Sequence, residues 1–100
     1  MIMGDLSVNS IPAKVLFDTG ALHSFISRPF VAKYELFTDE LSKPLTIASP
    51  GKMMNSRLIV LDVSIKMGNY SFPASPIVLG NSDNDLILGM DFLAMNKAYE

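Results

Sequence analysis

Hydrophobic and polar residues alternate along much of the chain with a period of two, which is typical of β-strands rather than of helices. The clearest alternation runs from Leu58 to Lys66. Its hydrophobic set is Ile59, Leu61, Val63 and Ile65. This pattern predicts one continuous strand over these residues, with one face in the core and the other in solvent.

Seven further segments have strand character, and residues that favour turns separate them. The predicted strands cover residues 5–8, 11–17, 23–26, 45–48, 70–72, 75–79 and 85–88. The turn formers are Asn9-Ser10, Ser49-Pro50-Gly51, Gly68-Asn69 and residues 80–83. Seven or eight short strands at this spacing predict an all-β fold, most simply a small closed β-barrel.

Two short helices are expected to interrupt the strands. Ser27 can cap the first, over about residues 28–34, and Pro29 is tolerated in its first turn. The second follows Gly89 over residues 90–96. The residues expected on its core-facing side are Met90, Leu93 and Ala94, at the spacing of one helical face.

Length and composition limit the class of protein. The 100 residues, 49% of them hydrophobic, suffice for a single domain over residues 1–100. A net charge of −2 argues against a dedicated nucleic-acid binder. With no cysteine and one histidine, the chain cannot form a thiolate zinc site, a cysteine nucleophile or a multi-histidine metal site, and we expect no cofactor.

The chain also lacks the sequence signals of membrane insertion or secretion. No apolar run approaches the roughly 18 residues of a membrane span. Asp5 interrupts an already short apolar start, which is unlike a secretory signal. We therefore expect a soluble, cytoplasmic domain that does not bind membranes.

The segment Leu16-Phe17-Asp18-Thr19-Gly20-Ala21 is the most informative about chemistry. A carboxylate at the end of a buried strand is costly unless other groups use or satisfy it. The Thr19 hydroxyl can hydrogen-bond nearby backbone, and Gly20 permits both a turn and the close approach of a ligand. The same residue types are at home in an ordinary turn, so this segment alone leaves both interpretations open.

A second segment, Ile87-Leu88-Gly89 followed by the predicted helix, lies about seventy residues later. The two segments together resemble the retropepsins, the aspartic proteases of retroviruses and long-terminal-repeat retrotransposons. The retropepsin signature is a hydrophobic-hydrophobic-Asp-(Thr/Ser)-Gly-(Ala/Ser) loop, then a distant hydrophobic-hydrophobic-Gly before a helix. The surrounding residues look most like the gypsy-type retrotransposon branch, and the resemblance covers about residues 4 to 95.

The resemblance implies a retropepsin-like β-barrel that contributes one catalytic aspartate, Asp18, to an active site shared by a homodimer. Peptide hydrolysis by carboxylates needs one group as base and another as acid. Two like carboxylates about 3 Å apart share one proton, and aspartic proteases are the standard example of such a pair. In the family, Thr19 would link the two loops through its hydroxyl, and Gly20 would contact the substrate backbone.

By position, the turn between the two motifs matches the family's flap, which closes over a bound peptide. As sequence alone, it is a hairpin with a Pro-Gly turn. The resemblance makes the following residues candidate substrate contacts: Ser49, Pro50, Gly51, Lys52 and Met53 of the flap, with Ala21 and Leu88 near the aspartate. Leu22 stands where many retroviral relatives carry another acid, and Asp91 is read as a first-turn acid favoured by the helix dipole.

Two functions remain open at this stage. The first is a homodimeric aspartic endopeptidase that hydrolyses polypeptide and processes its own polyprotein. The second is a catalytically silent retropepsin-like domain that acts as a binding or dimerisation module. The intact Asp18-Thr19-Gly20 favours the first, because drift in a silent copy would readily remove it. Many retropepsins continue into a terminal strand in the dimer interface, whereas this sequence ends at Glu100, so we expect a weak dimer.

Overall fold

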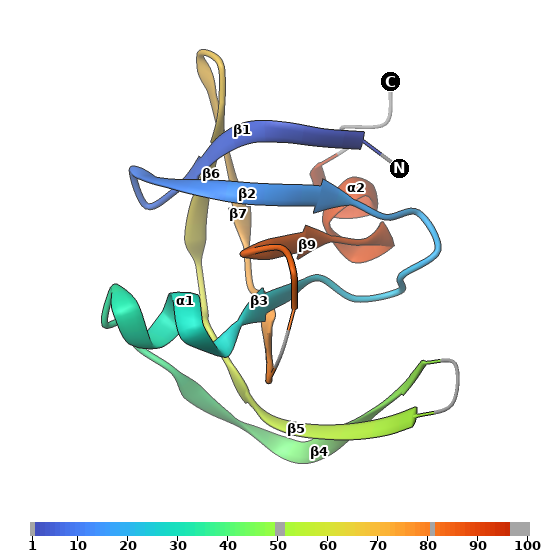
Figure 1. Ribbon diagram of the computed structural model, residues 1–100. Helices are drawn as coiled ribbons and strands as arrows, with labels where there is room; N and C mark the ends of the chain where they lie inside the picture. Colours follow the sequence, from blue (N-terminus) through green and yellow to red (C-terminus); the bar gives the residue numbers. More distant parts are fainter. Residues whose placement is uncertain (1, 50–51, 81, 97–100) are drawn as a thin grey trace.

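The computed structural model describes residues 2–49, 52–80 and 82–96, which form nine strands and two short helices (Figure 1). The strands are β1 (Ile2–Val8), β2 (Ile11–Phe17), β3 (Phe25–Ser27), β4 (Asp39–Ser49), β5 (Lys52–Ile59), β6 (Val63–Met67), β7 (Tyr70–Ala74), β8 (Ile77–Leu79) and β9 (Leu86–Leu88). The helices are α1 (Arg28–Lys33) and α2 (Met90–Asn96). Neither described helix is long enough to cross a membrane.

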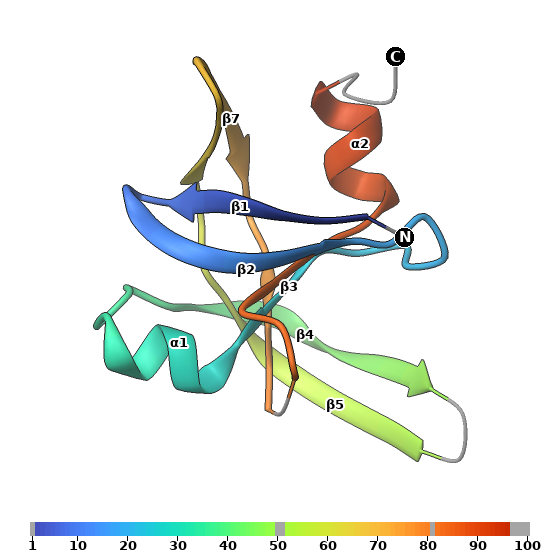
Figure 2. The same cartoon turned by 45° about the horizontal axis from the view of Figure 1, so that its top comes forward.

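Hydrogen bonds join the described strands into one sheet, in the order β4-β5-β8-β3-β9-β2-β1-β6-β7. Most neighbours are antiparallel, but β2 pairs with β9, and β3 with β8, in parallel. The sheet curls so that the β1–β2 and β4–β5 hairpins lie on opposite sides of β3 and β9 (Figure 1 and Figure 2). The mainly-β fold is confirmed, although the hydrogen bonds between the described strands leave β4 and β7 as open ends and do not close a barrel.

Two of the predicted turns form tight two-residue hairpins. Asn9 and Ser10 join β1 to β2 with φ values of 50° and 70°, the left-handed conformation that such turns require. The Asn9 side chain also accepts a hydrogen bond from the Ser64 backbone N–H (2.8 Å), which ties this hairpin to β6. Gly68, with φ of 60°, is the first residue of the two-residue turn between β6 and β7.

The prediction of one strand over residues 58–66 is wrong. The chain breaks between β5 and β6, where Asp62 has φ of 53° and Val60 donates its N–H to the Pro76 carbonyl (2.9 Å). This break shifts the alternation by one residue, so Val60 is 3% exposed and Leu61, expected in the core, is 50% exposed. A continuous strand cannot pair with β8 at one end and β1 at the other without such a turn.

Both helices form close to their predicted positions. The Ser27 hydroxyl caps α1 by accepting the Phe30 N–H (3.3 Å), as expected. In α2 the buried side chains are Phe92 and Leu93, whereas Met90 and Ala94, expected on the core side, are exposed. The Phe92 ring packs edge-on against Phe72 of β7, with ring centres 6.0 Å apart, and this contact sets the rotation of the helix.

The most deeply buried side chains belong to the strands in the middle of the sheet. They are Val8, Val15, Ile26, Ile65, Leu86 and Leu88, from β1, β2, β3, β6 and β9. In β2, β6 and β9 the buried residues alternate with more exposed ones, as expected for strands with one face on the core. Because this core anchors β2 and β9, the loops that follow these two strands start from fixed positions.

Candidate active site

Asp18 lies directly after β2, where two parallel strands end side by side. Phe17, the last residue of β2, pairs with Leu88, the last residue of β9. The Asp18 N–H then donates to the Leu88 carbonyl (3.0 Å), which extends the pairing by one residue. The two motifs, about seventy residues apart in sequence, therefore meet at one point, and Asp18 is half-buried there.

A tight turn follows Asp18 and fixes its side chain. The Gly20 N–H donates to Oδ1 of Asp18 (2.9 Å), and the Ala21 N–H donates to the Asp18 carbonyl (3.1 Å). Within the described part of the chain, the other carboxylate oxygen of Asp18 accepts no hydrogen bond. Thr19 and Gly20 are exposed at the tip of the turn. One carboxylate oxygen is thus held by the loop, and the other is free to contact a reacting group.

The start of α2 closes the loop from the other side. The Met90 N–H donates to the Ala21 carbonyl (2.8 Å), and the Asp91 N–H donates to the Leu22 carbonyl (3.2 Å). Gly89 lies so close to the loop that a β-carbon there would be 2.5 Å from the His23 carbonyl oxygen. Only glycine permits this approach, because real side chains essentially never come so near to a backbone oxygen.

Ser24 and Asp91 brace the loop, and no sequence pattern predicts this pair. Ser24 donates both its hydroxyl (2.6 Å) and its backbone N–H (3.0 Å) to the Asp91 carboxylate. From the sequence, Asp91 is expected only to be a first-turn acid favoured by the helix dipole. The available signal was a hydroxyl residue shortly after the Asp18 loop and an acid shortly after Gly89. Sequence alone does not show that these two residues meet.

The candidate substrate contacts fall into two groups. Ala21 and Leu88 lie beside Asp18 and belong to the loop and to β9. Ser49, Lys52 and Met53 lie in the β4–β5 hairpin, where Ser49 pairs with Lys52 and Ala48 with Met53. Pro50 and Gly51 lie outside the described residues. The hairpin extends on the same side of the molecule as the Asp18 loop (Figure 1 and Figure 2).

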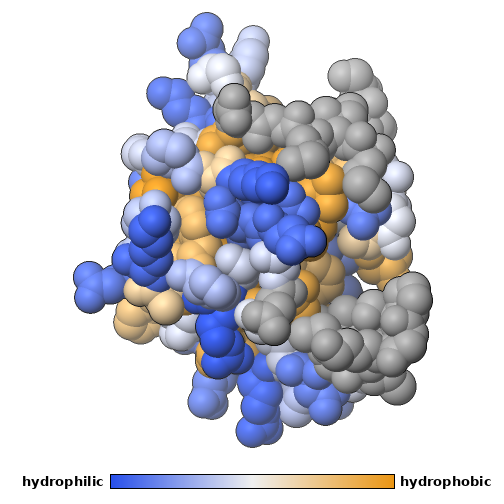
Figure 3. Space-filling view, in the orientation of Figure 1, coloured by the Kyte–Doolittle hydropathy of each residue, from blue (hydrophilic) through white to orange (hydrophobic). Residues whose placement is uncertain are grey.

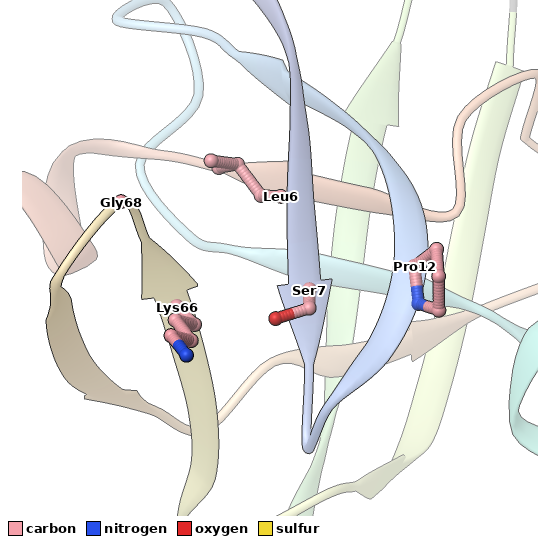
Figure 4. Close-up of a pocket in the computed structure, with 5 residues that line it drawn as sticks. All are labelled: Leu6, Ser7, Pro12, Lys66 and Gly68. Atoms are coloured by element: carbon pink, nitrogen blue, oxygen red, sulfur yellow. The ribbon is translucent and has the colours of Figure 1, made fainter.

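The described surface has further hollows that Asp18 does not line. Among the described residues, no group of three or more His, Cys, Asp or Glu side chains is placed to hold a metal ion. Two open hollows of about 310 Å³ each lie along the β1–β2 hairpin. One of them is lined by Leu6, Ser7, Pro12, Lys66 and Gly68 (Figure 4), which include no carboxylate, imidazole or thiol.

Replacing Gly89 by alanine should destabilise the protein strongly. The new methyl group would meet the Ala21 and His23 carbonyl oxygens at 2.7 and 2.5 Å, so the loop must move away from α2. We expect the free energy of unfolding to fall by about 2–3 kcal/mol. Urea unfolding followed by circular dichroism measures this change.

Gly80 provides the matched control, because a β-carbon there has nothing within 4 Å. Gly80→Ala should change the free energy of unfolding by less than about 1 kcal/mol. Equal losses in the two variants would show that the contact between Gly89 and the loop is not tight in solution.

Comparisons with known proteins give one consistent result. The family model for retroviral aspartyl protease matches residues 1–100. The Arabidopsis thaliana protein DNA-DAMAGE INDUCIBLE 1 is 27% identical over 99 residues, which are 97% of this chain but only 23% of that protein. The retroviral protease-like domain of Ddi1 from Leishmania major superposes with a TM-score of 0.77 at 18% identity, over 97% of this chain and 78% of that one.

A viral enzyme has the same fold. The protease of EIAV, solved in complex with the inhibitor HBY-793, superposes with a TM-score of 0.74 at 22% identity. The match covers 99% of this chain and 90% of the viral chain. The retropepsin-like fold is thereby confirmed. With the family model matched from end to end, the chain belongs to the retroviral aspartyl protease family.

Proposed function

We propose that the protein is an aspartic endopeptidase that acts as a homodimer and hydrolyses peptide bonds through a bound water. The observation that carries this proposal is the position of Asp18, which directly follows the central strand β2 beside β9 and begins a tight turn. In the reaction, one Asp18 takes a proton from water, and the water oxygen attacks the scissile carbonyl. The protonated Asp18 of the second copy stabilises the developing oxyanion, and the C–N bond of the tetrahedral intermediate then breaks as a carboxyl proton passes to the leaving nitrogen.

The need for a second carboxylate supports the homodimer. One chain supplies one Asp-Thr-Gly loop, and a twofold axis beside that loop is the simplest way to bring two copies of Asp18 together. Thr19 is exposed next to the aspartate, and Leu22 is 76% exposed in the same loop. Figure 3 shows apolar residues reaching the surface between polar ones on the face viewed.

The β4–β5 hairpin is proposed as the flap over an extended polypeptide substrate. It extends on the side of the Asp18 loop (Figure 2), so a peptide lying across the loop would pass beneath it. The proposed contacts are Ala21 and Leu88 with Ser49, Pro50, Gly51, Lys52 and Met53 of the flap. We further propose that the substrate is the polyprotein of a gypsy-type retrotransposon, cleaved in the cytoplasm. The residues around Asp18 and Gly89 are the support for that origin.

Cleavage of a peptide library by the purified protein tests this proposal. We expect cleavage to be blocked by a statine-containing peptide, because its hydroxyl group mimics the attacking water between the two carboxylates. Chelators and thiol reagents should have no effect, since the proposed reaction uses neither a metal nor a cysteine. A stable dimer that cleaves no peptide would instead favour the silent dimerisation module.

A further inference from the structure

The Asp18 loop is held by a second set of hydrogen bonds that does not involve β2. The Ser24 hydroxyl is at the centre of this set, since it accepts the Gly89 N–H (3.0 Å) and donates to Oδ1 of Asp91 (2.6 Å). The other Asp91 oxygen accepts the Ser24 backbone N–H, and Oδ1 also accepts the Phe92 N–H (2.6 Å). Ser24 thereby joins the end of the loop to Gly89, which precedes α2, and to Asp91 in the first turn of α2.

Ser24 is buried, whereas its partner Asp91 is exposed. Ser24 is 2% exposed, so water does not compete for its hydroxyl, although the Asp91 carboxylate also meets solvent. Hydrogen bonds to an ionised carboxylate are roughly twice as strong as bonds between neutral groups. A buried donor or acceptor that loses its partner also carries the full cost of desolvation. Removing the hydroxyl would leave the Gly89 N–H without its acceptor inside the protein.

A continuous path of bonds leads from Ser24 to Asp18. Ser24 fixes the start of α2, where the Met90 N–H holds the Ala21 carbonyl (2.8 Å). The Ala21 N–H in turn donates to the Asp18 carbonyl (3.1 Å). Thr19 and Gly20, between these points, are exposed and receive little support from packing. The orientation of the turn that carries Asp18 therefore depends on the position of Ala21, and through it on Ser24.

We infer that Ser24, with Asp91 as its partner, is a positioning residue that sets the orientation of the Asp18 carboxylate for catalysis. This inference rests on the proposed function for its effect on activity, but its structural part can be measured without any activity. Ser24 is not proposed to act as an acid, a base or a nucleophile. Its hydroxyl affects catalysis only by holding the loop that carries Asp18.

Ser24→Ala is the main test, and Ser27→Ala is its matched control. Ser27 lies in the same short segment and is similarly buried (4% exposed), but its hydroxyl caps α1, away from the loop (Figure 1). We expect Ser24→Ala to lower kcat by roughly 10- to 100-fold with little change in KM, because small misplacements of reacting groups have large costs. Ser27→Ala should keep kcat within about twofold of the wild-type value. Ser24→Thr retains the hydroxyl and should recover most of the wild-type kcat.

These assays use protein concentrations at which all variants sediment as the same species, so that dimer dissociation does not imitate a loss of kcat. Equal kcat losses in Ser24→Ala and Ser27→Ala would overturn the inference. A kcat of Ser24→Thr no higher than that of Ser24→Ala would also overturn the inference. If Ser24→Ala does not fold, Asp91→Ala takes its place, because it removes both acceptors of the Ser24 donors and leaves the Ser24 hydroxyl to accept the Gly89 N–H. It should lower kcat in the same way.

Amide hydrogen exchange separates this inference from the proposed function. In Ser24→Ala, exchange at Gly89 and Met90 should accelerate roughly tenfold, while exchange in α1 stays unchanged. Faster exchange at these two amides in Ser24→Ala, when the wild-type protein cleaves no peptide, would retain the bracing role of Ser24 and reject the enzyme. Unchanged exchange at Gly89 would reject the role of Ser24, whether or not the protein is a protease.

Discussion

Asp18→Asn is expected to abolish peptide hydrolysis, by about 10⁴-fold or more, while the fold remains intact. The amide can neither take a proton from water nor give one to the leaving group, and in a homodimer the substitution removes both carboxylates at once. The fold should survive, because asparagine retains the oxygen that accepts the Gly20 N–H (2.9 Å). Asparagine is also favoured in turns of this kind. Peptide cleavage measures the loss, and circular dichroism measures the fold.

Asp62→Asn is the control for this experiment. Asp62 is exposed between β5 and β6 and has φ of 53°, a conformation that asparagine adopts readily. The control should therefore keep full activity and stability. Turnover that persists in a verified Asp18→Asn preparation would show that the catalytic group lies elsewhere.

The second large effect concerns protein concentration. Because one chain holds only one Asp18, a monomer should have no activity, and specific activity should fall as the protein is diluted through the dimer dissociation constant. Well below that constant, the rate should vary with the square of the protein concentration. Cleavage assays combined with analytical ultracentrifugation over the same concentration range check this expectation.

Mixing provides an independent version of the same test. When wild-type chains are equilibrated with an equal amount of Asp18→Asn chains, random pairing leaves about a quarter of the dimers with two aspartates. Activity should fall to about half of that of the same wild-type protein without the mutant, at concentrations where all chains are paired. An addition of mutant that leaves activity unchanged would mean that each chain works alone.

The parts of the fold that depend only on residues close to one another in sequence were predictable. Asn9-Ser10 and Gly68-Asn69 form turns because their residue types tolerate left-handed conformations, whatever surrounds them. Ser27 caps α1 because its hydroxyl needs only the first turn of that helix. The Asp18 loop belongs to the same class, since Asp18, Gly20 and Ala21 hydrogen-bond to one another.

The features that depend on distant partners were not predictable. Alternation continues through Leu61, but pairing of β5 with β8 and of β6 with β1 forces a turn there. The spacing in α2 favours Met90 on the core side, yet the contact of Phe92 with Phe72 decides the rotation. The bond between Ser24 and Asp91 joins residues that neither local pattern nor periodicity connects.

The pairing of β2 with β9 also bears on when the site can form during synthesis. A ribosome makes Asp18 about seventy residues before Leu88, so a nascent chain displays the aspartate without the carbonyl that receives its N–H. Gly89, Met90 and Asp91, which hold the loop, are made later still. Whatever reaction the site performs, translation must pass α2 before it can begin. The topology thus delays assembly of the Asp18 site until residues 88–91 have been made.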